Sequence, residues 1–164
     1  MKRGTPIWIA NDHGGYEAKQ IIVKYLEEQK LPYKDLGSNS EEIVRYPYYA
    51  ARVAEAVSKG ITDRGILICS TGIGMSIMAN RYRGVRASLC TGVTEARLTR
   101  EHNDSNILCL GGRTLEEAVI LDILGIWLNT EFVGGRHNIS LGLIAEAEKS
   151  LCQSSEWIPE NRDL

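Results

Sequence analysis

The segment from Cys69 to Gly74 places a thiol, two hydroxyls and two glycines within six consecutive residues. It follows a short apolar run at 65–68 and precedes apolar residues at helical spacing in 75–82, so a strand, a tight loop and a helix N-terminus are predicted. Such a loop directs backbone N–H groups toward one point, where the helix dipole adds partial positive charge. An anion or a developing oxyanion is stabilised there, and a neighbouring thiol is favoured as its thiolate.

Further side chains suited to acid–base or anion chemistry lie in short polar or glycine-bearing segments. They are Asp12, His13, His102, Arg113, Arg136 and His137. Taken alone, each has an ordinary structural explanation, since Asp12 could cap a helix and His102 could be a favourable charge at a helix C-terminus. In an open parallel sheet, ligands bind beyond the carboxyl ends of the strands. We therefore expect these side chains to gather with Cys69 at one edge of a sheet.

The elements that would position these side chains alternate along the chain. Apolar runs typical of strands occupy 7–10, 31–36, 65–68, 85–90 and 107–110. Pro32 makes the second of them a weak or edge strand. Apolar residues at helical spacing occupy 18–26, 47–57, 75–82, 95–101, 114–129 and 139–151. Five β-α units in succession predict a doubly wound α/β domain.

Length and charge limit the class of protein. The chain has 164 residues, 43% hydrophobic and 24% charged, which suits one domain with a well-buried core over residues 1–151. Residues 152–164 are expected to form an unstructured polar tail. A formal charge of −2 gives no general attraction to nucleic acid or to an anionic membrane. Neither a signal peptide nor a membrane span is predicted.

The four cysteines form no disulfide or metal pattern. Cys69, Cys90, Cys109 and Cys152 are scattered, without a Cys-x-x-Cys pair or zinc-type spacing. Reduced thiols in the cytoplasm are the simplest interpretation. Cys90 and Cys109 are expected to be buried hydrophobic residues.

Four motifs follow one another in the chain: Asn-Asp-His-Gly-Gly at 11–15, Cys-Ser-Thr-Gly-Ile-Gly-Met-Ser at 69–76, Arg-Glu-His-Asn-Asp at 100–104 and Gly-Gly-Arg-His at 134–137. Together they resemble the motifs of the B-type ribose-5-phosphate isomerases, a family that includes galactose-6-phosphate isomerase subunits and allose-6-phosphate isomerases. The resemblance implies a Rossmann-like, three-layer α/β/α sandwich with a five-stranded parallel sheet, and neither a metal nor a nucleotide cofactor. It also implies a homodimer, or a dimer of dimers, in which each site is built from both subunits.

The resemblance further implies an aldose–ketose isomerisation through a cis-enediolate, which needs a base, an oxyanion site and a group that opens the sugar ring. Cys69 resembles the base of the family, and His102 resembles the histidine that opens the furanose ring. Thr71, with Asn103, resembles the residues that steady the sugar oxygens or relay protons there. The enediolate oxygen would be held by backbone N–H groups of Ser70, Gly72, Ile73 and Gly74.

The remaining positions resemble residues that contact the sugar or its phosphate. Asp12 resembles a residue that binds sugar hydroxyls. The positions that resemble phosphate or sugar contacts are His13, Arg113, Arg136 and His137. We expect Arg113 and Arg136 to act on a neighbouring subunit's site, and the long helix 114–129 to offer surplus apolar residues to that neighbour.

The identity of the substrate rests on one departure from the family pattern. The family commonly carries another arginine three residues after the histidine of Gly-Gly-Arg-His, where this chain has Ser140. The favoured reaction converts ribose 5-phosphate to ribulose 5-phosphate, a step of the pentose phosphate pathway. The alternatives are isomerisation of allose or galactose 6-phosphate, a tetrose phosphate or a free sugar, and a non-catalytic phosphosugar-binding module. A different thiol enzyme, such as an acyl transferase or reductase, would need a histidine within hydrogen-bond reach of the thiol.

Overall fold

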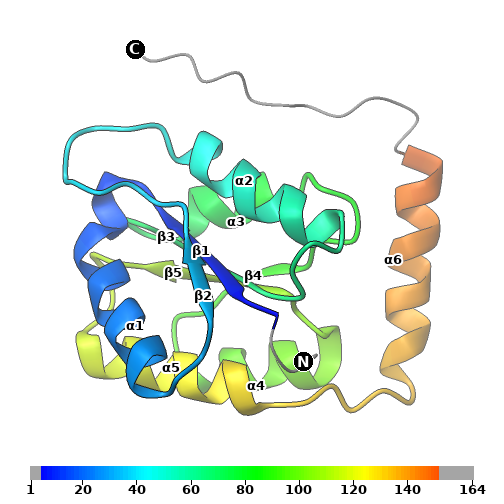
Figure 1. Cartoon of the computed structure of the whole chain (residues 1–164). Coiled ribbons are helices and arrows are strands. Elements are labelled where there is room, and N and C mark those ends of the chain that lie inside the picture. Colours follow the sequence, from blue (N-terminus) through cyan, green and yellow to red (C-terminus); the bar gives the residue numbers. More distant parts are fainter. Residues whose placement is uncertain (1–4, 152–164) are drawn as a thin grey trace.

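The computed structural model describes residues 5–151, which form a five-stranded parallel sheet with helices on both faces (Figure 1). The strands are β1 (Ile7–Asn11), β2 (Tyr33–Asp35), β3 (Gly65–Cys69), β4 (Ala87–Leu89) and β5 (Ile107–Gly111). Their order across the sheet is β2-β1-β3-β5-β4, and every pairing is parallel. The predicted doubly wound fold is confirmed, and β2 is the short edge strand expected after Pro32.

Helices cover both faces of the sheet and make the three layers of an α/β/α sandwich. One face carries α1 (Tyr16–Glu28), α4 (Val93–Asn103) and α5 (Glu117–Asn129). The other face carries α2 (Tyr46–Ser58) and α3 (Ile73–Ala79). A short 3-10 helix, His13–Gly15, joins β1 to α1.

The central strand β3 is buried at every position. Ile66 and Ile68 pack into the core cluster beneath α1, α4 and α5, whereas Leu67 and Cys69 pack into the cluster beneath α2 and α3. Successive side chains of a strand point to opposite faces, so a strand between two helical layers needs an apolar side chain at each position. Burial of each large apolar side chain contributes about 1.5–3 kcal/mol. This requirement explains the unbroken apolar run in the sequence.

Helix α5 places its apolar side chains in the core of its own chain. The fully buried ones are Ile120, Ile123, Leu124 and Trp127, and Val119, Ile126 and Leu128 pack partly buried against the same cluster. The expectation that the helix 114–129 offers surplus apolar residues to a neighbour is therefore wrong. A helix that packs against the sheet and against α1 and α4 together needs an apolar surface wider than one stripe.

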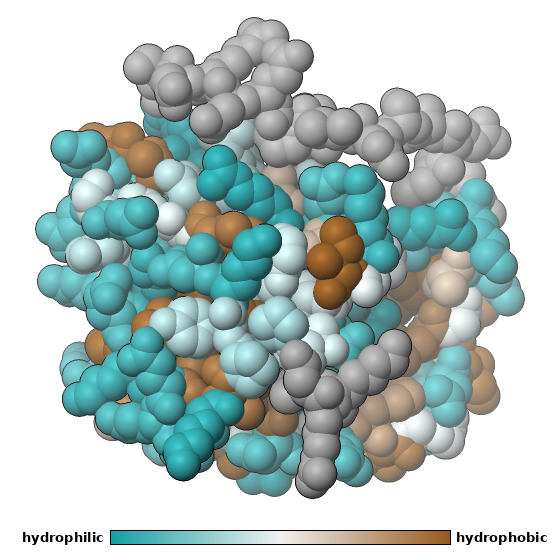
Figure 2. All heavy atoms as spheres, in the orientation of Figure 1, coloured by the Kyte–Doolittle hydropathy of each residue, from teal (hydrophilic) through white to brown (hydrophobic). Residues whose placement is uncertain are grey.

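Helix α6 (His137–Leu151) stands beside the edge of the sheet where the strands begin, rather than over either face (Figure 1). It contacts α4, and its Glu148 carboxylate accepts a hydrogen bond from the Gly84 N–H at 2.9 Å. Ile139, Leu143 and Ile144 are 70%, 60% and 47% exposed. Figure 2 shows hydrophobic residues along this helix. Helix α6 thus presents exposed apolar side chains that a partner could contact.

Two expectations concern the ends of the chain and the membrane. The predicted polar tail, residues 152–164, lies outside the described residues. None of the described helices has the length and apolar composition needed to cross a membrane.

A buried lysine anchors the loop between β2 and α2. Lys19 of α1 is 1% exposed, and its Nζ lies 2.8 Å from the Asp35 carboxylate and donates to the Ser38 carbonyl at 2.8 Å. The loop continues to Val44, whose carbonyl oxygen is 3.3 Å from Nδ1 of His13. One ion pair therefore connects α1, the end of β2 and a loop that reaches a candidate site residue.

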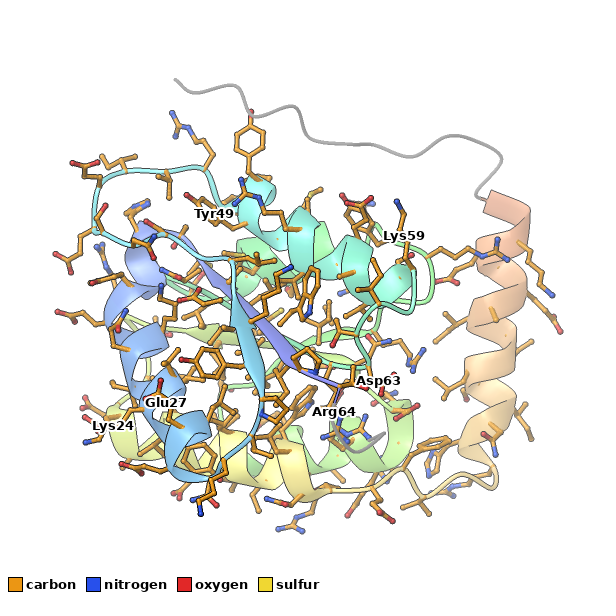
Figure 3. All side chains as sticks on the ribbon, viewed as in Figure 1. Lys24, Glu27, Tyr49, Lys59, Asp63 and Arg64 are labelled. Carbon is orange, nitrogen blue, oxygen red and sulfur yellow. The ribbon has the colours of Figure 1, made fainter. Side chains whose placement is uncertain are left out.

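Lys19→Met should lower the free energy of unfolding by about 1.5–3 kcal/mol, because it removes charged hydrogen bonds and leaves the Asp35 carboxylate without its cation. Chemical denaturation measures the change. Lys24→Met is the matched control, since Lys24 is an exposed lysine on the same helix (Figure 3), and it should shift stability by no more than about 0.5 kcal/mol. Equal losses in the two variants would contradict the anchoring role.

Candidate active site

Cys69 ends β3, and its side chain is only 6% exposed. The chain then turns at Gly72, whose φ of 76° is a left-handed conformation that favours glycine. A Cβ at Gly72 would also lie 2.6 Å from the Leu89 side chain. The turn brings the Gly72 N–H to 3.1 Å from the sulfur of Cys69, and α3 begins at the next residue. The predicted strand, tight loop and helix N-terminus are confirmed, with a backbone donor directed at the thiol.

Backbone contacts hold the rest of this loop in place. The Ser70 carbonyl accepts a hydrogen bond from the Arg113 N–H at 3.1 Å. A Cβ at Gly14 would lie 2.1 Å from the Ser70 Oγ, so this serine occupies the space that a larger residue there would need. Thr71 is exposed, and its Oγ1 accepts a long hydrogen bond of 3.4 Å from the Ile73 N–H. The Thr71 hydroxyl is therefore available to a ligand at the edge of the sheet.

Asp12 lies beside this loop, just after β1. Its backbone N–H donates to the Ile68 carbonyl at 3.2 Å, and its carboxylate accepts from the Gly14 N–H at 2.9 Å, so it caps the 3-10 helix. Burial raises the pKa of Asp12, and the Gly14 hydrogen bond and the positive charges of His13 and Arg113 lower it by smaller amounts. Asp12 is thus 6% exposed, and its capping role is visible directly in the structure.

Arg113 belongs to the same edge of its own chain. It interacts electrostatically with Asp12, and the preceding Gly112 N–H donates to the Cys69 carbonyl at 2.8 Å. In the sheet, Cys69 pairs with Gly111, two residues before Arg113. The register of β3 and β5 therefore places Arg113 beside its own chain's thiol loop, which favours a role in the site of its own chain over one in a neighbour's site.

Two residues at the start of α2 join this edge without a prior signal in the sequence: Val44 of the preceding loop and Tyr46, the first residue of the helix. The Val44 backbone contacts the His13 ring, and Tyr46 packs its ring 2.8 Å from the point that a Cβ at Gly74 would occupy. The only available hint was position, since a loop that follows a strand and precedes a helix must lie at the carboxyl-terminal edge of the sheet. Neither side chain belongs to a recognisable motif.

The other candidate residues lie at the opposite, amino-terminal edge. Helix α4 ends at Asn103, only four residues before β5 begins at Ile107, so His102 and Asn103 lie where the strands start. The segment that carries Arg136 is attached there too, because the Val133 N–H donates to the Glu101 carbonyl at 3.1 Å. The expectation that all candidate residues gather at one edge is wrong, because a helix between parallel strands runs back and ends at the other edge.

Two histidines meet at this amino-terminal edge. The rings of His102 and His137 are stacked, with centroids 4.3 Å apart and planes 13° from parallel. Desolvation lowers the pKa of His137, and the nearby charges of His102 and Arg136 lower it further. The two histidines are about 13 Å or more from the thiol, because the length of β3, at about 3.3 Å per residue, separates the two edges of the sheet.

Two further cysteines of the described residues, Cys90 and Cys109, are structural. Burial raises the pKa of Cys90 to about 12 and that of Cys109 well above its ordinary value, so both stay protonated. This confirms their expected character as buried hydrophobic residues. Among residues 5–151, no three histidine, cysteine or acidic side chains come together in a way that could hold a metal ion.

Comparison with known proteins decides the family. The family model described as ribose/galactose isomerase matches residues 7–144. The chain belongs to this family. A solved ribose-5-phosphate isomerase B from Clostridium thermocellum superposes with a TM-score of 0.86 at 48% identity, covering 88% of this chain and 98% of that one. Ribose-5-phosphate isomerase B of Escherichia coli is 41% identical over 138 residues, covering 84% of this chain and 93% of that protein.

Membership in the ribose/galactose isomerase family confirms the resemblance and makes the protein an isomerase of the sugar phosphate class. A relative from Bacillus subtilis, 46% identical over 142 residues and covering 86% of this chain and 95% of that protein, carries only the broader and provisional name of sugar phosphate isomerase. The class of reaction is thus common to these relatives, whereas their names do not agree on one sugar.

Asp12→Asn should raise the melting temperature at neutral pH, because it removes a carboxylate whose ionisation is disfavoured by burial. Since the folded-state pKa of Asp12 is raised, the wild type loses stability as the pH rises from the ordinary value of 3.8 through the raised value. The advantage of the variant should therefore shrink toward zero below pH 3.8. Thermal melts across this range test the sign, and a variant that melts below wild type at neutral pH would contradict it.

Proposed function

We propose that the protein interconverts ribose 5-phosphate and ribulose 5-phosphate through a cis-enediolate, with Cys69 as the base. The observation that carries this proposal is the Cys69 sulfur at the end of β3, 6% exposed and 3.1 Å from the Gly72 N–H. A hydrogen-bond donor directed at sulfur stabilises negative charge there, and the thiolate is the form that can take a proton from carbon. The relatives named ribose-5-phosphate isomerase B support the choice of a pentose phosphate.

Each proton in the proposed reaction has a defined destination. The Cys69 thiolate takes the proton from C2 of the open-chain aldose, and negative charge develops on the C1 carbonyl oxygen. Backbone N–H groups of the loop 70–74 would stabilise that oxygen. The Cys69 thiol then returns its proton to C1, while the hydroxyl proton passes from O2 to O1 with Thr71 beside it. Asp12 would accept hydrogen bonds from the sugar hydroxyls.

A second copy of the chain would complete this site. His102 and Cys69 lie at opposite edges of one sheet, so one chain cannot bring both to the same pentose. In a two-fold dimer, the amino-terminal edge of each chain can face the carboxyl-terminal edge of the other. The exposed apolar side chains of α6, which begins at His137, offer a surface for that contact. A homodimer or a dimer of dimers with shared sites is the assembly proposed.

Phosphate binding is assigned to His13 and Arg113 from one chain and to Arg136 and His137 from the other. Ser140 is exposed in the first turn of α6, one helical turn beyond Arg136, and cannot supply the charge-assisted contact of an arginine. The same residues would also isomerise another sugar phosphate, provided that the length of its carbon chain suits a site with serine in place of arginine at position 140. A cytoplasmic location and a place in the pentose phosphate pathway accompany the ribose 5-phosphate assignment.

Cys69→Ala should lower kcat by at least about 10²–10⁴-fold and leave KM within a few-fold, because the thiol transfers a proton and does not hold the substrate. In deuterium oxide, the wild type should incorporate deuterium at C1 or C2 of the sugar, and the variant should not. Cys90→Ala, at a second buried cysteine, is the matched control and should keep turnover.

The same exchange assay distinguishes the sugars. Tetrose, pentose and hexose phosphates and their free sugars are compared with the wild type, and the pentose phosphate should exchange fastest. Exchange with another sugar phosphate alone would change the assigned substrate and support the same mechanism. An absence of exchange with every sugar would remove the isomerase assignment in favour of a binding module.

Mixed dimers test the shared site directly. Cys69→Ala and His102→Asn should each be nearly inactive on the cyclic sugar as pure dimers. A mixed dimer of the two keeps one intact site if Cys69 of one chain works with His102 of the other. Random co-assembly should therefore restore about a quarter of wild-type activity, since about half of the dimers are mixed and each has one working site. Activity no greater than that of the separate variants would show that each site comes from one chain.

A further inference from the structure

A cavity of about 420 Å³ opens at the amino-terminal edge of the sheet, away from the Cys69 thiol of the same chain. It lies between the segment that leads into β3 and the C-terminal end of α4, and Figure 3 shows two of its lining residues, Asp63 and Arg64, at the side of the sheet that faces α6. Three arginines, Arg64, Arg86 and Arg100, line it together with two acidic residues, Asp63 and Asp104. We propose that this amino-edge cavity binds the phosphate group of a small molecule, independently of the catalytic site.

Arg64 supplies unused hydrogen-bond donors to the amino-edge cavity. Its side chain is 8% exposed, and its Nη1 donates to the carbonyls of Trp127 and Leu128 at 3.5 and 2.8 Å. Within residues 5–151, no carboxylate pairs with Arg64 and no acceptor bonds its Nε or Nη2. In this part of the chain, the only fully buried side-chain nitrogen or oxygen without a partner is Oδ1 of Asn11, so the free Arg64 nitrogens must be open to solvent. A planar pair of such donors suits bidentate binding of a phosphate.

The other two guanidiniums are held rigidly. Arg100 is 5% exposed, and its Nη1 donates to the Asp104 carboxylate at 2.8 Å and to the Ser105 carbonyl at 2.6 Å. Arg86 contacts the other oxygen of the same carboxylate at 3.2 Å. Asp104 is thus shared by two cations, and its charge is already engaged. The side chains are fixed before any ligand arrives, which reduces the entropy lost on binding.

Positive charge exceeds negative charge around this cavity. Burial lowers the pKa of Arg64 to about 10, and the nearby positive charge of Arg100 contributes to the decrease more than any other charge. Arg64 still remains charged at neutral pH, so two guanidiniums repel each other across a partly buried space. An anion bound between them would remove that repulsion and provide the missing acceptor.

The amino-edge cavity is distinct from the histidine pair on the same helix. Arg100 lies over the Trp127 ring, with its guanidinium carbon 5.8 Å from the ring centroid, whereas His102 stacks on His137. Residues two apart on a helix project to roughly opposite sides. The volume falls within the range of about 300–1,000 Å³ of small-molecule sites. It therefore has room for inorganic phosphate or for a small phosphate monoester.

Calorimetric titration of the full chain with inorganic phosphate tests the proposal. Arg64→Gln should weaken binding at this site by at least about ten-fold, the loss expected for a charged hydrogen bond. Asp63→Asn should strengthen it by about two- to five-fold, because it removes a lining carboxylate. Arg113→Gln is the matched control, since it removes an arginine from the catalytic edge and should leave this site unchanged. Turnover close to wild type in Arg64→Gln shows that the variant is folded.

Two further probes identify the source of the phosphate. Glycerol 3-phosphate is compared with glycerol, and only the phosphorylated compound should bind in an Arg64-dependent manner. Binding of inorganic phosphate alone would support the site and assign it to the free ion. Phosphate binding that is lost in Arg113→Gln and unchanged in both Arg64→Gln and Asp63→Asn would overturn the proposal, because phosphate would then occupy only the catalytic edge. If Arg64→Gln does not fold, the direction of the Asp63→Asn effect decides.

Discussion

The common direction of the five strands determines where every functional residue of this chain can lie. Since each strand runs the same way, each helix between two strands must run back, and the residues after strands and after helices collect at opposite edges. Cys69 ends a strand, and Asp12 and Arg113 follow strands, whereas His102 lies in the last turn of a helix and His137 follows the segment after α5. The division of the candidate catalytic residues is therefore a property of the fold. The proposed sharing of sites between two chains is a consequence of the same constraint.

Backbone hydrogen bonds between loops fix the position of the thiol. The loop after β1 is joined to β3 by the Asp12 N–H, and the loop after β5 is joined to it by the N–H groups of Gly112 and Arg113. Close approach of these loops leaves no space for larger residues, since a Cβ at Gly111 would lie 3.0 Å from the Thr71 carbonyl. The three loops contact one another where β1 and β3 adjoin, the point at which the chain order reverses across the sheet.

The sheet and the thiol loop could be predicted because their signals are local. The apolar run before Cys69 indicates a buried strand, and the glycine at position 72 indicates a tight turn. The contribution of Tyr46 could not be predicted, because it depends on a loop held by the ion pair of Lys19 and Asp35, sixteen residues apart in sequence. The apolar residues of α5 and α6 look alike in sequence, and only the packed structure separates core from exposed surface. The topology of the sheet could have predicted the edge at which His102 lies. The residues of its motif do not themselves indicate an edge.

Two charged groups whose burial is energetically unfavourable lie at the two ends of the sheet. Asp12 is a buried carboxyl with a raised pKa at one end, and Arg64 is a buried guanidinium with a lowered pKa at the other. Between them, β3 contains only apolar residues and Gly65. Groups whose burial is unfavourable for folding commonly lie where a protein binds a ligand. The proposed catalytic site explains the burial of Asp12. The Arg64 guanidinium lies over the Trp127 ring, 5.2 Å from its centroid, and its Nη1 bonds the last carbonyls of α5, which leaves Nε and Nη2 without an acceptor among residues 5–151. A surface lysine could satisfy those carbonyls at a lower desolvation cost. The burial of the Arg64 guanidinium, with its remaining donors open to a cavity, is therefore best explained by a bound anion.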